Sequence, residues 1–314
     1  MKNDISIKIN GFSEEISLQI VDKLKKIINE FTTLDFRRLK NIIITSNFEQ
    51  DIDKLTTNNQ TRFKNRYKTS SDTYASVLTI PNKTDFELIL IIKSDFIKNL
   101  LEDNKDQGYK NALHIINHEL AHIHDNNKKI DVFKDLMKTN SYKGKDSIIY
   151  PMAETCWSEY IANYLSSPSA LNTDYPKIMA KALTIKIKET SFNIKTELTA
   201  YKINKNREDL VESCIEQVES LLKNASYLLG YLHGLNISLE ELDYESDYIL
   251  ETSYFKDIWE ALQSEFYSIG NIYPNGFINL SIYKNLTFYI EAFYNQMGIV
   301  FDENEKEKLK IHIM

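Results

Sequence analysis

The feature that most constrains this 314-residue chain is the five-residue run HELAH at residues 118–122. It lies inside an apolar-periodic stretch from about 109 to 126, which predicts an α-helix. On a helix, His118 and His122 lie about 40° apart on one face, one turn above the other, so both imidazoles can bind one metal ion. Glu119 lies about 100° round from His118 and can reach a metal-bound water without being a ligand, which is the arrangement of a zinc hydrolase.

A catalytic zinc usually has three protein ligands and one open position, so a third ligand is needed elsewhere in the chain. The metzincin extension requires a Gly and a His further along the same stretch, but Asp125 and Lys128 occupy those positions. The gluzincin extension requires a Glu on a separate helix in the pattern E-x-x-[SA]-[DN], and residues 159–163 (EYIAN) match it. Glu159 is therefore the predicted third ligand, and Glu154, about 140° away on the same helix, is the weaker candidate.

The helix that carries Glu159 is expected to begin at Pro151 and to end where residues 166–169 (SSPS) break the pattern. Asn163, one turn after Glu159, is a candidate to hold the free nitrogen of a ligand histidine. Asp125 shares the ligand face of the first helix and is a candidate for the same role, with simple solvent exposure as the alternative. Both residues would support the metal ligands without binding the metal.

Together these residues resemble the ImmA/IrrE-type metallopeptidases within the gluzincins. The resemblance rests on the HELAH run, the two strand-like segments before it and the EYIAN run after it, and it covers roughly residues 70–168. It implies a zincin fold, zinc bound by His118, His122 and Glu159, and Glu119 as general base in peptide-bond hydrolysis. It also makes a regulatory protein a plausible substrate.

The composition is typical of a soluble globular protein, with 42% hydrophobic and 26% charged residues, and the small numbers of Gly (8) and Pro (5) favour long helices. A net charge of −7 disfavours binding to nucleic acid or to an anionic membrane. No apolar run approaches the ~18 residues of a membrane span, and residues 1–15 lack a secretory signal. Two cysteines, Cys156 and Cys214, are too few for a disulfide framework, so a cytoplasmic protein is expected.

The pattern as a whole predicts an α+β fold in two domains. Residues 1–168 are expected to form a zincin-like metallopeptidase core, in which a small, mostly antiparallel sheet supports the two metal-binding helices. Its strands are expected near 5–9, 41–45, 74–80 and 86–92, the last two as an antiparallel hairpin. An exposed strand edge in such a core can hold an extended peptide substrate.

The polar, lysine-rich stretch 126–150 is expected to be a surface connection, with a cover or gate over the cleft as the alternative. Residues 169–314 are expected to form a mainly helical domain that is a candidate to close the cleft and to set specificity. Its helices are expected at about 176–198, 207–234, 254–266 and 280–297.

His233 is a candidate for a further catalytic role, because a donor from the helical C-terminal half could stabilise the tetrahedral intermediate. The alternative is ordinary capping, since a Gly follows it near a predicted helix end. Tyr231 is a poorer candidate for the same role. His114, one turn before His118 on the same face, is expected to support the ligands or to be structural, not to bind the metal. His124 is expected at the surface.

The prediction is therefore a zinc-dependent metallopeptidase that acts on an intracellular protein or peptide, with Glu119 moving the proton from water to the leaving amine. One alternative is a metal-stabilised zincin-scaffold module that binds a partner without cleaving it. Another is a structural helical protein whose motif is fortuitous. An intact Glu119 favours the enzyme, because a module that only binds needs no base. Nucleic-acid and membrane binding are not expected, and the oligomeric state is open.

Overall fold

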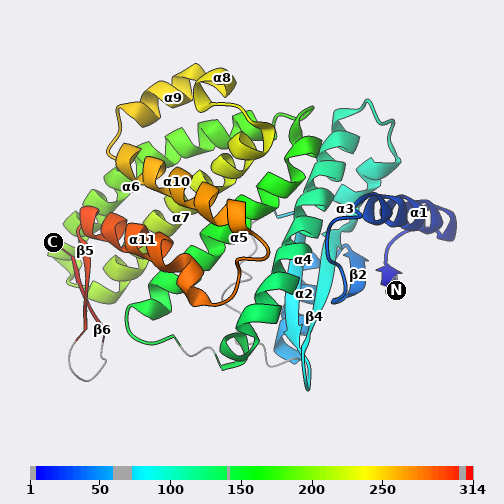
Figure 1. Cartoon of the computed structure of the whole chain (residues 1–314), viewed down its shortest axis with the longest axis horizontal. Helices are drawn as coiled ribbons and strands as arrows, with labels where there is room; N and C mark the ends of the chain where they lie inside the picture. The colour runs from blue at the N-terminus through cyan, green and yellow to red at the C-terminus, as the bar shows by residue number, and fades with distance from the viewer. Residues whose placement is uncertain (1–4, 59–72, 140–141, 304–308, 314) are drawn as a thin grey trace. The chain divides into compact units, whose positions relative to one another are not determined.

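The computed structural model describes residues 5–58, 73–139, 142–303 and 309–313. Its contacts divide the chain into two compact units. The first contains Met1–Asn140 and Leu165–Thr173, and the second contains Ser141–Tyr164 and Asp174–Met314. The fold is α+β as predicted, with a four-stranded sheet in the first unit and mainly helices in the second (Figure 1).

The sheet of the first unit has the strand order β1-β2-β4-β3. β2 pairs in parallel with both β1 and β4, whereas β3 pairs antiparallel with β4. The prediction of a mostly antiparallel sheet is therefore wrong, while the predicted hairpin is confirmed. Parallel neighbours need a crossover connection, which α1 supplies between the first two strands. The elements are β1 (Ser6–Ile9), α1 (Glu14–Glu30), β2 (Leu39–Thr45), β3 (Ala75–Pro81) and β4 (Phe86–Lys93).

Helices cover both faces of this sheet, because alternate side chains of β4 point to opposite faces. One face packs against α1 and α4 (Gln107–Thr139), in a buried cluster that includes Leu90 of β4 and Leu120 of α4. The other face packs against α2 (Phe48–Asn58), where Ile91 joins a cluster with Phe48. Burial on both faces explains the near-continuous apolar run of β4. α4 therefore packs against the sheet through the helix face that carries Leu120.

α4 continues well beyond the predicted helix, and the stretch expected to be a surface connection is helical as far as Thr139. Ion pairs to the sheet hold this polar extension. Arg38 Nη1 lies 2.9 Å from Asp131, and Lys134 Nζ lies 3.2 Å from Asp85. The sequence alone did not show these partners, because Arg38 and Asp85 precede α4 by many residues. The short α3 (Ser94–Ile97) and η2 (Lys98–Leu101) connect β4 to α4.

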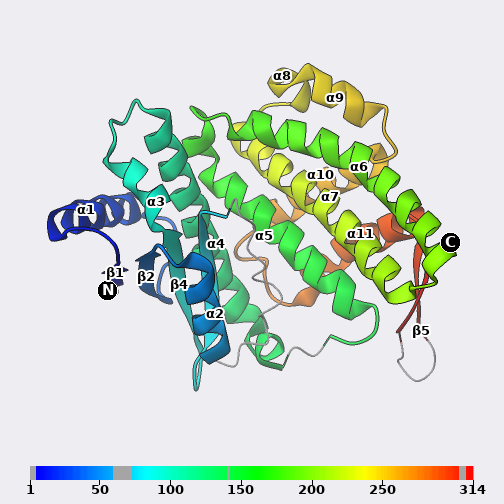
Figure 2. The same ribbon diagram turned by 180° about the vertical axis from the view of Figure 1, so that it is seen from behind.

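The second unit is a layered set of helices in which α6 and α7 lie side by side (Figure 2). The four helices predicted for this part of the chain are confirmed, with ends that differ by a few residues, whereas α8, α9 and the hairpin of β5 and β6 were not predicted. No helix within the described ranges is both long and apolar enough to cross a membrane. The elements are α6 (Tyr175–Asn204), α7 (Arg207–Leu235), α8 (Leu239–Leu242), α9 (Tyr244–Glu251), α10 (Lys256–Ile272), η3 (Leu280–Tyr283), α11 (Lys284–Gln296), β5 (Ile299–Glu303) and β6 (Leu309–Ile313).

α5 (Asp146–Ala170) is one unbroken helix that contributes residues to both units. It begins five residues before Pro151, and it does not break at residues 166–169, so both predicted ends are wrong. The Ser169 hydroxyl donates to the Ser166 carbonyl over 2.7 Å, which gives a polar partner to the backbone next to Pro168. The compact units therefore differ from the predicted domains 1–168 and 169–314, because the first part of α5 belongs to the second unit.

α5 and α7 approach each other closely at Gly230. A Cβ at this position would lie 2.4 Å from the Tyr160 backbone oxygen and 2.7 Å from the Asn163 Cβ. We expect Gly230→Ala to lower the free energy of unfolding by about 2 kcal/mol, because the cost of overpacking exceeds the gain in helix propensity. Urea unfolding measures this change.

The matched control for Gly230 is Gly270 in α10, where an added Cβ would lie 3.6 Å from the Tyr160 hydroxyl, an ordinary contact. Gly270→Ala is expected to raise the free energy of unfolding by up to about 1 kcal/mol through helix propensity alone. Equal effects of the two substitutions would contradict the close packing at Gly230.

Candidate metal centre

The two histidines of the HELAH run face each other on α4. The Nε2 atoms of His118 and His122 are 3.0 Å apart, and the rings are perpendicular with centroids 4.5 Å apart. His118 is buried and His122 is partly buried. On the opposite side of the helix, Ile116, Leu120 and Ile123 are fully buried in the sheet core. The helix is therefore anchored by its apolar side, as its periodicity predicts.

The last residues of α5 belong to the first unit and contact α4 there. In the first unit, His114 Nδ1 lies 3.0 Å from the Ser169 hydroxyl. Glu159 precedes Ser169 by ten residues, which is about 15 Å along α5. His122 follows His114 by eight residues, which is about 12 Å along α4. Glu159 is thus about as far from this contact along α5 as His122 is along α4.

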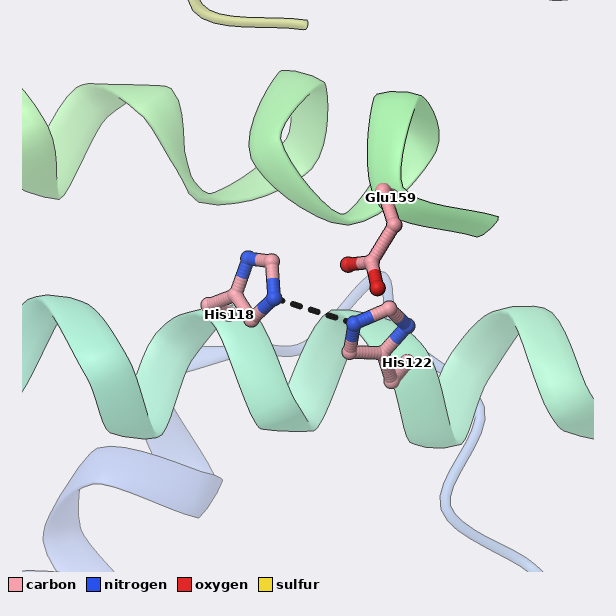
Figure 3. A group of neighbouring side chains, drawn as sticks. All are labelled: His118, His122 and Glu159. Carbon is pink, nitrogen blue, oxygen red and sulfur yellow. Dashed lines mark hydrogen bonds between the residues drawn. The ribbon is translucent and has the colours of Figure 1, made fainter. Parts of the chain in front are cut away.

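The ligand atoms of His118, His122 and Glu159 all lie within 4.8 Å of one another, and the carboxylate points toward the two rings (Figure 3). Two nitrogens bound to one tetrahedral zinc at about 2.0–2.1 Å would lie about 3.3 Å apart, close to the observed Nε2 separation. Two imidazoles and one carboxylate are also a common ligand set of catalytic zinc. The group can therefore hold a metal ion, and it consists of the three residues predicted as ligands.

A lysine that the sequence analysis missed lies next to the carboxylate. Lys223 Nζ on α7 is 3.0 Å from Glu159 Oε1. The negative charge of Glu159 raises the pKa of Lys223. Burial, and to a smaller extent the same carboxylate, raises the pKa of the neighbouring Tyr227. Lys223 is 64 residues from Glu159 in sequence, and only the packing of α7 against α5 brings the two side chains together. The proposed metal ligand is thus also one half of an ion pair.

Glu119, the predicted base, is buried on α4. Its position in sequence between the two histidines places it beside them, and its catalytic role stays a prediction.

Asn163 links α5 to α7, because its Nδ2 donates to the backbone carbonyl of Tyr227 over 2.9 Å. Its Oδ1 is buried and has no hydrogen-bond partner among the described residues, so this oxygen can still accept a hydrogen bond. Asp125 is fully buried and forms an ion pair with Lys129 Nζ at 2.8 Å, so the alternative of simple exposure is wrong. That either residue orients a ligand imidazole stays a prediction.

His233 lies in the last turn of α7, and its Nδ1 is 2.9 Å from the hydroxyl of Tyr160. The Tyr160 ring stacks on Phe266 at 4.6 Å in the core of the second unit. Tyr160 follows Glu159 directly, so its side chain leaves α5 about 100° away from the carboxylate. The structure therefore pairs His233 with a core tyrosine and does not place it in the metal-binding group, and its catalytic role stays a prediction.

The two other histidines of α4 are both buried. Burial and the charge of His118 lower the pKa of His114 to about 3, so His114 is neutral at pH 7. His124 is buried, and its Nδ1 accepts the backbone N–H of Asp35 over 2.8 Å. The expectation that His124 lies at the surface is wrong, because the chain before β2 folds over this part of α4.

Comparison with protein-family models, with curated proteins and with solved structures finds no match to this chain. The resemblance to ImmA/IrrE-type metallopeptidases therefore rests on the motifs alone.

Proposed function

We propose that this protein is a zinc-dependent metallopeptidase, with zinc held by His118, His122 and Glu159 and with Glu119 as the general base. The observation that carries the proposal is the convergence of three suitable donor atoms from two separate helices within 4.8 Å. A fortuitous HELAH run gives no reason for a carboxylate from a second helix to meet its histidines. The resemblance to the ImmA/IrrE-type family adds support.

When bound, zinc would act as a Lewis acid that polarises a carbonyl and makes water nucleophilic near neutral pH. The chain's own groups have two further tasks. Glu119 accepts the proton of the attacking water and later donates it to the leaving amine, which is general acid–base catalysis. The sheet core fixes α4 from behind, so the base and the two imidazoles keep their relative positions.

The first unit also offers a place for an extended substrate. β3 is a terminal strand of the sheet and pairs only with β4 among the described strands. α4 packs against β3, so this strand edge and the HELAH helix belong to one compact body. A peptide that added to the edge of β3 would be held by backbone hydrogen bonds. We therefore propose a protein or peptide substrate, such as a regulatory protein, that is bound in extended form.

Exposure of the zinc-loaded protein to a proteome-derived peptide library tests the proposal. New peptide termini, detected by mass spectrometry, are expected with zinc and not after chelation. A protein that binds zinc stoichiometrically and cleaves nothing in the library would count against a peptidase and in favour of the non-cleaving module.

We expect Lys223→Met to bind zinc roughly tenfold more tightly than the wild type. The ammonium competes for the Glu159 carboxylate and repels a divalent cation, and the substitution removes both effects. The same variant is expected to be less stable without metal, because a nearly buried carboxylate loses its ion-pair partner. Competition with a zinc-sensitive chelator measures the affinity, and thermal melting measures the stability.

Lys186→Met is the control for Lys223→Met. Lys186 also forms an ion pair at 3.0 Å, with Glu189, but on the surface of α6. The Lys186→Met substitution is expected to change neither the zinc affinity nor the metal-free stability by a measurable amount. Weaker zinc binding in the Lys223 variant would show that the ammonium helps to position Glu159, contrary to this prediction.

A further inference from the structure

α6 carries an exposed apolar stripe. Ile178, Ile185 and Phe192 are 50%, 52% and 70% exposed. They are spaced seven residues apart, so they share one face of the helix with a drift of only about 20° per repeat. The stripe is about 21 Å long. Single exposed apolar residues are ordinary, but an aligned set of three indicates a surface that another molecule covers.

A row of lysines runs beside this stripe. Lys181, Lys188 and Lys195 each follow a residue of the stripe by three positions, about 60° round the helix. All three are exposed, and none forms an ion pair with another described residue. α6 contains six Lys and two Glu in a chain whose net charge is −7. The stripe and its lysine row, called here the α6 face, therefore suit an apolar or aromatic partner surface with negative charge.

Such a surface exists in the same unit, on α8 and α9. Tyr244 and Tyr248, one turn apart, are 67% and 60% exposed, whereas Ser246 and Leu250 of the same helix are buried. One face of α9 is therefore buried in the unit, and the two tyrosines lie on a different, exposed face. The segment 239–251 has no basic residue and six acidic ones, which are Glu240, Glu241, Asp243, Glu245, Asp247 and Glu251. This exposed side of α8 and α9 is called the α9 face.

We propose that the α6 face of one copy of this chain binds the α9 face of a second copy. The apolar stripe would pack on Tyr244 and Tyr248, and the lysine row would lie opposite the acidic side chains. The two faces do not meet within one chain, because α9 lies beside α6 (Figure 2) while the tyrosines and the apolar stripe both stay exposed. Aromatic anchors with complementary charge around them are typical of specific protein interfaces.

An anionic membrane is the other surface that a basic, apolar helix face fits. The position of α8 and α9 argues against it, because six acidic residues beside α6 would be repelled by the same lipid. The second copy accounts for both exposed faces at once, whereas a membrane accounts for only one of them.

Two charge-reversal variants test the proposal by sedimentation equilibrium at moderate salt. Lys181→Glu with Lys188→Glu reverses the α6 face, and Glu245→Lys with Asp247→Lys reverses the α9 face. The wild type is expected to self-associate, and each variant alone is expected to associate at least tenfold more weakly. An equimolar mixture should associate again, because each reversed face then meets the other reversed face and each native face meets a native one. Far-UV circular dichroism checks that the variants are folded.

Lys25→Glu with Lys26→Glu on α1 is the matched control, since both side chains are exposed and lie in the first unit. This variant should associate like the wild type. A wild type that stays monomeric at 100 µM would overturn the proposal, as would mixed variants that stay apart. Loss of association in the α6 variant alone would place the contact elsewhere. Binding to phosphatidylserine vesicles by a monomeric wild type would assign the α6 face to a membrane.

Discussion

Replacing Glu119 by glutamine is expected to abolish peptide hydrolysis while the protein still binds about one zinc per chain. Glutamine has nearly the same shape as glutamate but cannot accept the proton of the attacking water. General base catalysis is worth about 10²–10⁴ in rate, so the loss should reach at least a hundredfold. Glu119 is not among the three residues that converge as ligands, so metal binding should survive. Cleavage assays on the peptide library and elemental analysis measure the two properties.

Glu154→Gln provides the comparison for the Glu119 variant. Glu154 lies on α5, five residues before Glu159, where its carboxylate accepts a hydrogen bond of 2.6 Å from the Tyr142 hydroxyl. The substitution is likewise glutamate to glutamine, but outside the ligand group, so hydrolysis should continue. Full activity of the Glu119 variant would mean that another group is the base. Zinc loss in that variant would mean that Glu119 is itself a ligand.

Loss of a ligand is expected to remove the metal and with it much of the stability. His118→Ala and Glu159→Ala should each purify with little zinc, because two remaining donors bind zinc weakly. A ligand present at about a thousand times its dissociation constant stabilises the folded state by about 4 kcal/mol. For a chain of this size, chelation should therefore lower the melting temperature of the wild type by roughly 5–10 °C. The two ligand variants should melt at the same temperature with and without chelator.

The decisive comparison is between Glu159→Ala and Glu154→Ala, which remove carboxylates from the same helix. Only the first is expected to lose zinc. Unchanged zinc content in the Glu159 variant would remove this residue as the third ligand. If chelation left the melting temperature of the wild type unchanged, the HELAH run would be a coincidence in a buried helix, and the protein would be structural.

The features that could be predicted depend on residues close together in sequence. The spacing of His118 and His122 decides that they share a helix face, since a turn of helix is 3.6 residues. The hairpin of β3 and β4 follows from two apolar runs joined by a short turn. The long helices of the second unit follow from apolar periodicity with few Gly or Pro. The pattern E-x-x-[SA]-[DN] added a prediction over a longer distance in sequence, because it selected Glu159 as the third ligand from a chain with many acidic residues.

The features that could not be predicted depend on contacts between distant segments. The parallel pairing of β1 with β2 is decided by how α1 crosses over the sheet, and an alternating strand pattern is the same in both pairings. α4 extends to Thr139 because Arg38 and Asp85 hold its charged surface. α5 continues through Pro168, although the serines and proline there read as a break. For the sheet and for α4, contacts between distant segments decide what the local pattern leaves open.

The same division applies to the candidate metal centre. The sequence by itself determined which three side chains can bind a metal, because residue type and helical spacing restrict the ligands. Only the tertiary structure decided what surrounds them. It placed Lys223 beside Glu159, buried Asp125 next to Lys129, and paired His233 with Tyr160. The physical reason is range: a helix orders residues within a turn or two, whereas charge pairing and burial act between segments that only the folded core brings together.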